Sequence, residues 1–83
     1  MALLEFTPKA SSRHSFDVYF FGDKIGDIIN ESSQCYTIYI FGLMVDIQRS
    51  KKEAFNRVRF IELAELSSYK MKADLKREGV KVA

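Results

Sequence analysis

The sequence predicts a small α+β protein, in which an antiparallel sheet of three to four strands is followed by a long C-terminal helix (β-β-β-α order). Three observations predict this class. Residues 16–41 are rich in aromatic and β-branched residues with short polar breaks, as in strands joined by hairpins. A capping serine and a terminal glycine bracket residues 50–79. The chain has 83 residues, 47% of them hydrophobic, which suits one small domain with a core.

The first 15 residues are expected to form a flexible lead-in that precedes a single domain over residues 16–83. Residues 3–6 are apolar enough for a short strand. Residues 7–15 hold the only proline and four hydroxyl residues, a composition that favours irregular backbone.

The first predicted hairpin has Gly22 and Asp23 as the central residues of its turn. This turn sets the facing pairs Phe20 and Ile25, Val18 and Asp27, and Phe16 and Ile29. A five-residue connection over residues 30–34 then leads to a strand over residues 35–41, and residues 43–48 form a fourth extended piece. In this register Cys35, Thr37, Tyr39 and Phe41 join the face of Phe16.

The helix is predicted to begin at Lys51, because Ser50 and Glu53 have the spacing of a capping box. Gly79 is predicted to end it in the left-handed conformation, after basic residues that favour a helix end. Two alternatives stay open: a break at residues 67–68, and a strand over residues 57–61. As one helix, it carries a second apolar stripe that resembles a packing seam, formed by Phe60, Ala64, Met71 and Leu75.

The second face of the predicted sheet is also apolar, which one helix layer does not explain. This face would present Tyr19, Phe21, Ile28, Tyr36, Ile38 and Ile40. Three coverings are compatible with it. The segments 1–6 and 43–47 could fold across it, a second copy of the chain could bury it, or a nucleic acid could stack on its tyrosines.

Basic residues are concentrated in the second half of the chain. Residues 1–48 carry three bases against six acids, and residues 49–83 carry ten bases against five acids. This asymmetry favours a polyanionic partner, although a solvated helix face with ion pairs would look similar. The residues expected to contact nucleic acid are Arg49, Lys51, Lys52, Arg57, Arg59, Lys70, Lys72, Lys76 and Arg77.

We therefore expect a small non-enzymatic binding protein that contacts nucleic acid, or a nucleic-acid-handling complex, through its basic helix. The alternative is a homodimeric protein-protein interaction module or inhibitor that uses the apolar sheet face and the second helical stripe. The interface residues of this alternative are Tyr19, Phe21, Tyr36, Ile38, Phe60, Met71 and Leu75.

No catalytic, metal or cofactor motif is expected. His14 lies in the lead-in without an acid partner, and Cys35 lies in an apolar strand without an adjacent base. The single cysteine and the lack of a signal peptide or membrane-spanning run predict a cytoplasmic protein with no membrane partner. The sequence shows no small-molecule substrate site.

Overall fold

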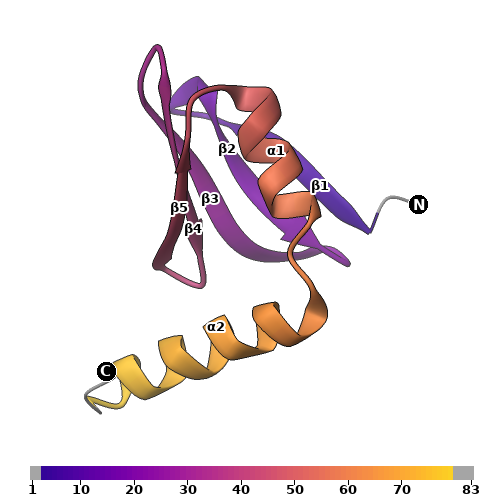
Figure 1. The fold of residues 1–83 in the computed structure, drawn as a ribbon, viewed down its shortest axis with the longest axis vertical. Coiled ribbons are helices and arrows are strands. Elements are labelled where there is room, and N and C mark those ends of the chain that lie inside the picture. Colours follow the sequence, from indigo (N-terminus) through magenta and orange to yellow (C-terminus); the bar gives the residue numbers. More distant parts are fainter. Residues whose placement is uncertain (1–2, 80–83) are drawn as a thin grey trace.

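A computed structural model of the protein describes residues 3–79, and these residues form one five-stranded antiparallel sheet and two helices (Figure 1). The elements are β1 (Leu4–Lys9), β2 (Ser12–Phe20), β3 (Asp23–Ser32), β4 (Cys35–Ile40), β5 (Leu43–Gln48), α1 (Lys51–Arg59) and α2 (Leu63–Arg77). The strand order in the sheet follows the chain, so the sheet is a meander. The predicted α+β class is confirmed. The structure corrects the three to four strands to five, and the single helix to two.

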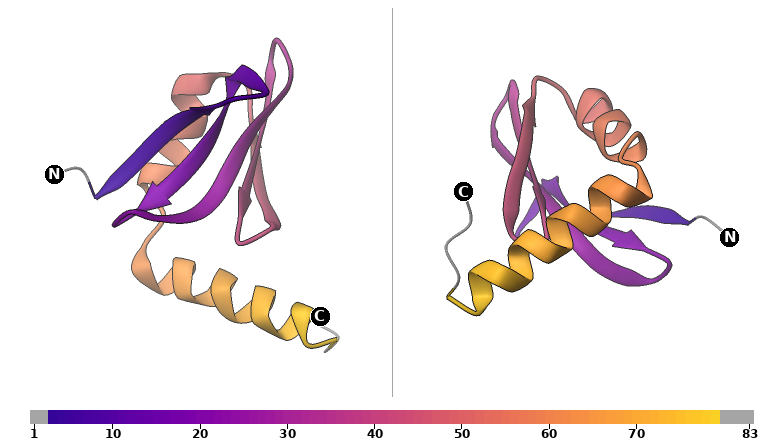
Figure 2. Two further views of the ribbon diagram at one scale, coloured as in Figure 1. Left: turned by 180° about the vertical axis from the view of Figure 1, so that it is seen from behind. Right: turned by 60° about the horizontal axis from the view of Figure 1, so that its bottom comes forward.

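The two helices occupy different places on the sheet. α1 covers one face, which we call the inner face, and α2 lies beyond the end of the sheet near the β2–β3 and β4–β5 turns (Figures 1 and 2). No helix in the described part covers the opposite, outer face (Figure 2, left). The core lies between α1 and the inner face, and consists of Phe16, Val18, Ile25, Ile28, Ile38, Ile40, Ala54 and Val58.

The segment expected to be an irregular lead-in is mostly strand. β1 extends to Lys9 and β2 begins at Ser12, and the two strands pair with Phe6 opposite Val18. Pro8 is tolerated because β1 is an edge strand, where a missing N–H leaves no ladder bond broken. Ser15, read as a loop residue, is buried, and its hydroxyl accepts a hydrogen bond from the backbone N–H of Asn30 at 2.9 Å.

Two hairpin turns repeat the same dipeptide. Phe21 and Gly22 have φ values of 52° and 83°, and Phe41 and Gly42 have values of 52° and 81°, as type I′ turns require. The prediction of a turn centred on Gly22 and Asp23 is therefore wrong by one residue. Neighbouring strands hold both phenylalanines in this uncommon conformation, because Phe21 N–H donates to Leu3 O at 2.8 Å and Phe41 N–H donates to Ile25 O at 2.7 Å.

The shifted turn and a bulge at Val18/Tyr19 change the predicted register. Phe16 lies opposite Ile28, and Val18 lies opposite Gly26. β3 continues to Ser32, which pairs with Cys35, so the loop to β4 is shorter than expected. Relative to Phe16, the faces predicted for both β3 and β4 are wrong, because the bulge at Val18/Tyr19 shifts the pairing by one residue and so exchanges the two faces. The inner-face residues of β3 and β4 are Ile28, Tyr36, Ile38 and Ile40, and the outer-face residues are Asp27, Ile29, Thr37 and Tyr39.

The helix caps follow the sequence prediction. The Ser50 side chain accepts a hydrogen bond from Glu53 N–H at 3.1 Å, and α1 begins at Lys51. After α2 ends, Gly79 adopts a positive φ of 82°, which confirms the predicted left-handed terminus.

The helical segment breaks at residues 60–62, not at residues 67–68. The backbone of Glu62 is extended, with ψ 158°, and α2 starts in a new direction at Leu63 (Figure 1). The alternative of a strand over residues 57–61 is also wrong, because residues 57–59 complete α1. The break carries no glycine or proline. Ile61 lies in the break and Leu66 lies in the first turn of α2, and both side chains pack against the core.

We predict that Gly26→Ala destabilises the protein strongly, by about 3 kcal/mol, because overpacking has no room to relax here. A Cβ atom at Gly26 would lie 2.2 Å from the backbone oxygen of Tyr39 on the paired strand. Urea denaturation at equilibrium measures this loss.

Gly22→Ala is the matched control, since no atom lies within 4 Å of a Cβ at that position. Its positive φ of 83° leaves only backbone strain, about 1 to 2 kcal/mol. Equal losses in the two variants would contradict this account of Gly26.

Candidate nucleic-acid interface

The nine basic residues predicted as nucleic-acid contacts fall into three environments. Arg57 and Arg77 form ion pairs. Lys51 and Arg59 lie over aromatic rings. The others form no ion pair with any residue of the described range 3–79: Arg49, Lys52, Lys70, Lys72 and Lys76.

Arg57 is part of a polar cluster that joins three elements. Its Nε donates to Asp46 Oδ2 on β5 at 3.0 Å, and its Nη2 donates to Glu65 Oε2 on α2 at 3.2 Å. The hydroxyl of Tyr69 also donates to Glu65. We call Asp46, Arg57, Glu65 and Tyr69 the Arg57 cluster. Both carboxylates are engaged with this guanidinium, so Arg57 holds the fold together and is not available to a phosphate.

The ionisation of the Arg57 cluster reflects these contacts. The N–H of Ile47, with the Arg57 guanidinium, holds the pKa of Asp46 below its ordinary value. Hydrogen bonding from Tyr69 and then Arg57 lowers the pKa of Glu65, while burial and Glu65 raise the pKa of Tyr69. Burial disfavours the charge on Arg57, but its two carboxylates outweigh burial and raise its pKa. The guanidinium and both carboxylates of the cluster are therefore charged at neutral pH.

A second charge cluster occupies the outer face and is also internally satisfied. Asp17 and Asp27 are opposite each other on β2 and β3, and Lys9 and Lys24 each contact both carboxylates. Hydrogen bonds from Lys9 and Lys24 lower the pKa of Asp17. In turn, the carboxylates of Asp17 and Asp27 raise the pKa of both lysines. The two lysines neutralise acids that would otherwise repel each other across the ladder.

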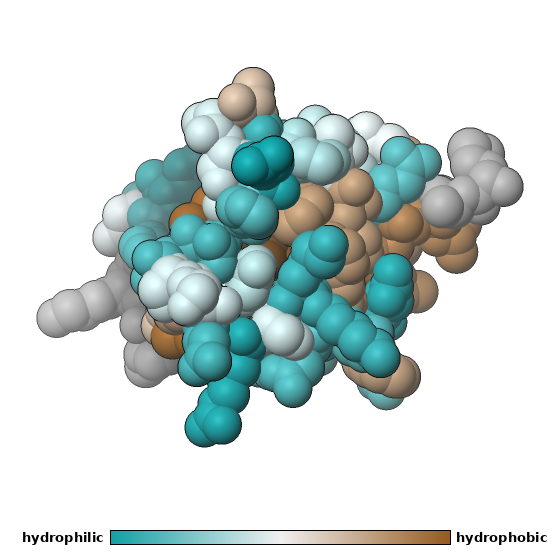
Figure 3. All heavy atoms as spheres, turned by 90° about the horizontal axis from the view of Figure 1, so that it is seen from above, coloured by the Kyte–Doolittle hydropathy of each residue, from teal (hydrophilic) through white to brown (hydrophobic). Residues whose placement is uncertain are grey.

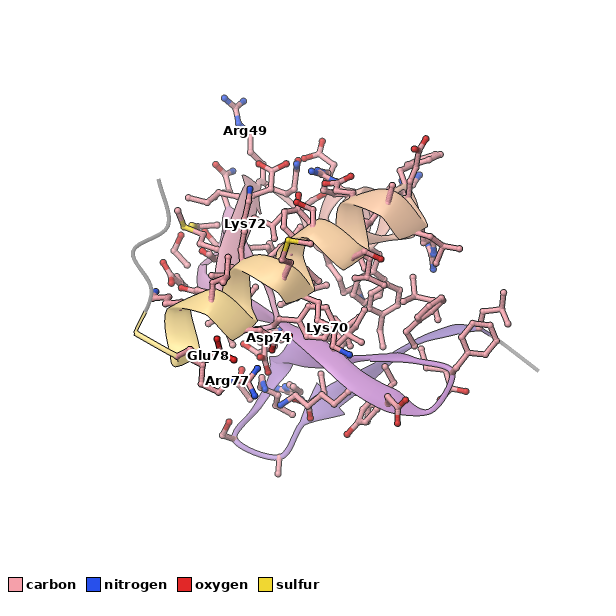
Figure 4. The ribbon with its side chains drawn as sticks, turned by 90° about the horizontal axis from the view of Figure 1, so that it is seen from below. Arg49, Lys70, Lys72, Asp74, Arg77 and Glu78 are labelled. Carbon is pink, nitrogen blue, oxygen red and sulfur yellow. The ribbon has the colours of Figure 1, made fainter. Side chains whose placement is uncertain are left out.

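The start of α1 carries the clearest group of unpaired cations. We call Arg49, Lys51 and Lys52 the N-terminal basic cluster, and all three side chains are exposed. Arg49 projects away from the body of the molecule (Figure 4). Backbone N–H groups and the helix dipole add positive potential at this helix end, which favours anions. Glu53 is the acid in the first turn, so the cluster keeps a net positive charge.

Aromatic rings hold two cations of α1 in place. Phe6 of β1 stacks on Phe55 of α1 with ring centroids 4.1 Å apart, and the Arg59 guanidinium carbon lies 5.5 Å and 5.8 Å from these two rings. Lys51 Nζ lies 5.9 Å from the centroid of Phe16. The view from above shows hydrophobic surface exposed between hydrophilic side chains (Figure 3).

The cations of α2 do not form one surface. Lys72 points to one side of the helix, while Lys70 and Arg77 lie on the other side (Figure 4). Arg77 forms an ion pair with Asp74, and Glu78 lies beside it (Figure 4). The predicted contact residues therefore separate into a compact group on α1 and a dispersed group on α2.

The residues of the alternative interface also separate. Ile38 is fully buried and Tyr36 packs against the core, so both lie on the face that α1 covers together with Phe16 and not on the second face where they were predicted. Tyr19 lies half-buried on the outer face and Phe21 is exposed at the first turn. The predicted stripe from Phe60 to Leu75 does not exist as one helical face, because the helix breaks after residue 59. Phe60 and Met71 are nevertheless exposed.

The two residues weighed in the sequence as catalytic candidates, His14 and Cys35, lie on different strands, β2 and β4. His14 is exposed and Cys35 is half-buried. In the range 3–79, no three His, Cys, Asp or Glu side chains are grouped so that they could hold a metal ion. Neither α1 nor α2 combines the length and apolarity needed to cross a lipid bilayer.

Sequence reasoning missed Phe6 and Phe55 as partners of Arg59, and Asp46 and Glu65 as partners of Arg57. Phe6 and Phe55 are distant in the chain and meet only through the tertiary fold. Asp46 did carry a signal, because it interrupts the apolar run of residues 43–47. A buried or half-buried acid needs a cationic partner.

Comparisons with known proteins add no identification, because no protein-family model, curated protein or solved structure matches the chain.

We predict that Arg57→Gln lowers the free energy of unfolding by about 1 to 2 kcal/mol at neutral pH, less than for a fully buried pair because its partners are partly solvated. The pKa values of Asp46 and Glu65 are depressed in the folded state. Their stabilising contribution is therefore present above their unfolded values of about 4 and is lost as the pH falls below these values and through the lower folded values. Urea denaturation at neutral and acidic pH should show the variant's deficit shrinking in acid.

Arg77→Gln is the matched control, since its ion pair with Asp74 is exposed on the surface. We expect a change of less than about 0.5 kcal/mol for such a pair. An Arg57→Gln deficit that stays constant with pH would contradict the assigned role of the two carboxylates.

Proposed function

We propose that the protein binds nucleic acid through the N-terminal basic cluster of α1. The observation that carries this proposal is the grouping of Arg49, Lys51 and Lys52 at one helix N-terminus, where none of them is paired with an acid of residues 3–79. Clustered cations that lack acid partners bind phosphates with release of counterions. A solvated structural surface would more often interleave the two signs of charge.

The partly ordered cations favour binding over a purely solvated role. Within the N-terminal basic cluster, Lys51 lies against the ring of Phe16. Side chains that are held in place before binding lose less conformational entropy when they contact a phosphate. Arg59 lies at the far end of α1, about 12 Å of helix from Lys51, and is not part of the proposed phosphate-binding group.

The proposed binding is directed at the backbone and not at the bases. Phe16 is buried, and Phe6 and Phe55 already stack on each other beneath Arg59, so these rings are not free for bases. Phosphate contacts position a nucleic acid without reading its sequence. We expect similar affinities for different sequences and a strong dependence on salt.

We predict that changing Arg49, Lys51 and Lys52 together to Glu weakens binding to short labelled DNA and RNA oligonucleotides by at least about tenfold at low salt. Fluorescence anisotropy measures the affinity over a salt series. The slope of log affinity against log salt should become shallower by about 0.7 to 0.9 for each phosphate that the variant no longer neutralises. Acidic residues in the first turn also suit the helix dipole, so α1 should stay folded.

The matched control is the change of Lys70, Lys72 and Lys76 to Glu, which alters the net charge equally at the dispersed α2 positions. We expect a smaller loss of affinity in this variant. Equal losses of affinity in the two variants would show that net charge alone determines binding, which would contradict a site at the start of α1. Unchanged binding in the first variant would refute the proposal.

A further inference from the structure

An apolar cavity lies where the two helices meet the sheet. Its volume is about 200 Å³, and it opens between the end of β2, the start of β1 and the helix connection. The side chains that line it include Leu4, Phe20, Ile25, Val58, Ile61 and Leu66. We call it the elbow pocket, because residues 60–62 form the elbow between α1 and α2.

Large apolar side chains are exposed around the elbow pocket. Phe60 is 79% exposed, and it lies in the chain between Arg59 and Ile61, which both line the pocket. Leu63 and Leu3, at 68% and 54% exposed, are themselves part of its lining. An open apolar cavity bordered by exposed apolar side chains marks an interaction site more often than a bare surface does.

We propose that the elbow is the interface of a two-fold symmetric homodimer, in which Phe60 of each protomer enters the elbow pocket of its partner. A two-fold contact uses the same patch on both subunits, so the patch must contain both the projection and the cavity that receives it. The elbow contains both. An apolar cavity of about 150 Å³ can hold a benzene molecule, so the elbow pocket has room for one phenyl ring.

The charges at the elbow are also self-complementary. Arg59 and Glu62 are both exposed on either side of Phe60 and Ile61, and neither forms an ion pair with any residue of the range 3–79. In an antiparallel contact across a two-fold axis, Arg59 of one protomer faces Glu62 of the partner subunit, and the reverse. Opposite charges at the rim favour this contact over a random apolar one.

The dimer does not depend on the proposed nucleic-acid function. Phe60 follows the C-terminal end of α1, whereas the N-terminal basic cluster lies at the other end of this nine-residue helix. The basic cluster therefore stays accessible in the dimer. A loss of dimerisation and a loss of nucleic-acid binding can be measured separately.

The first test is the mass of the protein in solution, measured by sedimentation equilibrium from low to high micromolar concentration. The native chain should be dimeric at high concentration. Phe60→Asp should raise the dissociation constant by at least about 30-fold, as removal of a central aromatic anchor does. Met71→Asp is the matched control, since Met71 is exposed on α2 and does not line the pocket, and it should leave the constant unchanged.

The second test separates contacts between chains from contacts within one chain. Arg59→Glu and Glu62→Arg should each weaken the dimer, because like charges then face each other across the axis. A mixture of the two single variants should form a heterodimer. Across its axis, the glutamate introduced in the first variant faces the arginine introduced in the second, and the unchanged Glu62 of the first faces the unchanged Arg59 of the second. Like charges face each other only when a variant pairs with itself. Circular dichroism confirms that each variant is folded.

A native chain that is monomeric at every concentration would overturn the proposal. It would also fall if Phe60→Asp dimerised as well as the native chain, or if the mixed charge variants failed to associate.

Discussion

Arg57 is the residue on which the arrangement of the two helices depends. It lies on α1 and contacts Asp46 of β5 and Glu65 of α2, so one side chain ties together three consecutive elements. α2 needs this tie, because none of its residues is fully buried and only its first turns pack against the core. The elbow and its pocket follow from the same contact. If α2 were not held at this angle, Leu66 would not close one wall of the cavity.

The basic half of the chain combines structural and functional use of the same residue types. Arg57 has two carboxylate partners, and Arg59 is held on aromatic rings by packing that also builds the core. The cations without an acid partner among residues 3–79 are therefore fewer than the composition suggests, and those at the start of α1 form the compact group. Net charge describes a chain as a whole, whereas binding depends on which charges lack a partner.

The sequence was a good guide to local features and a poor guide to features set by distant contacts. Ser50 and Gly79 marked real helix ends because capping depends on residues three or four positions away. The faces of β3 and β4 were mispredicted relative to Phe16, because one bulge beside Val18 shifts the pairing of β2 with β3 by one residue. The break at residues 60–62 has no glycine or proline to reveal it. The N-terminal basic cluster could be predicted because its members are adjacent in sequence, but the pairing of Arg57 with Asp46 could not.

The meander has a consequence for how the chain reaches its fold. Each strand pairs with the strand next to it in the chain, so the sheet can grow one hairpin at a time with short loops to close. The stacking of Phe6 on Phe55 is different, because it joins the first strand to the first helix across the whole sheet. Because β2 to β5 lie between these two rings in the chain, the contact closes a much longer loop than any hairpin of the sheet. The aromatic stack therefore costs more chain entropy to form than the strand pairs do, and Arg59 gains its two rings only when β1 and α1 have come together.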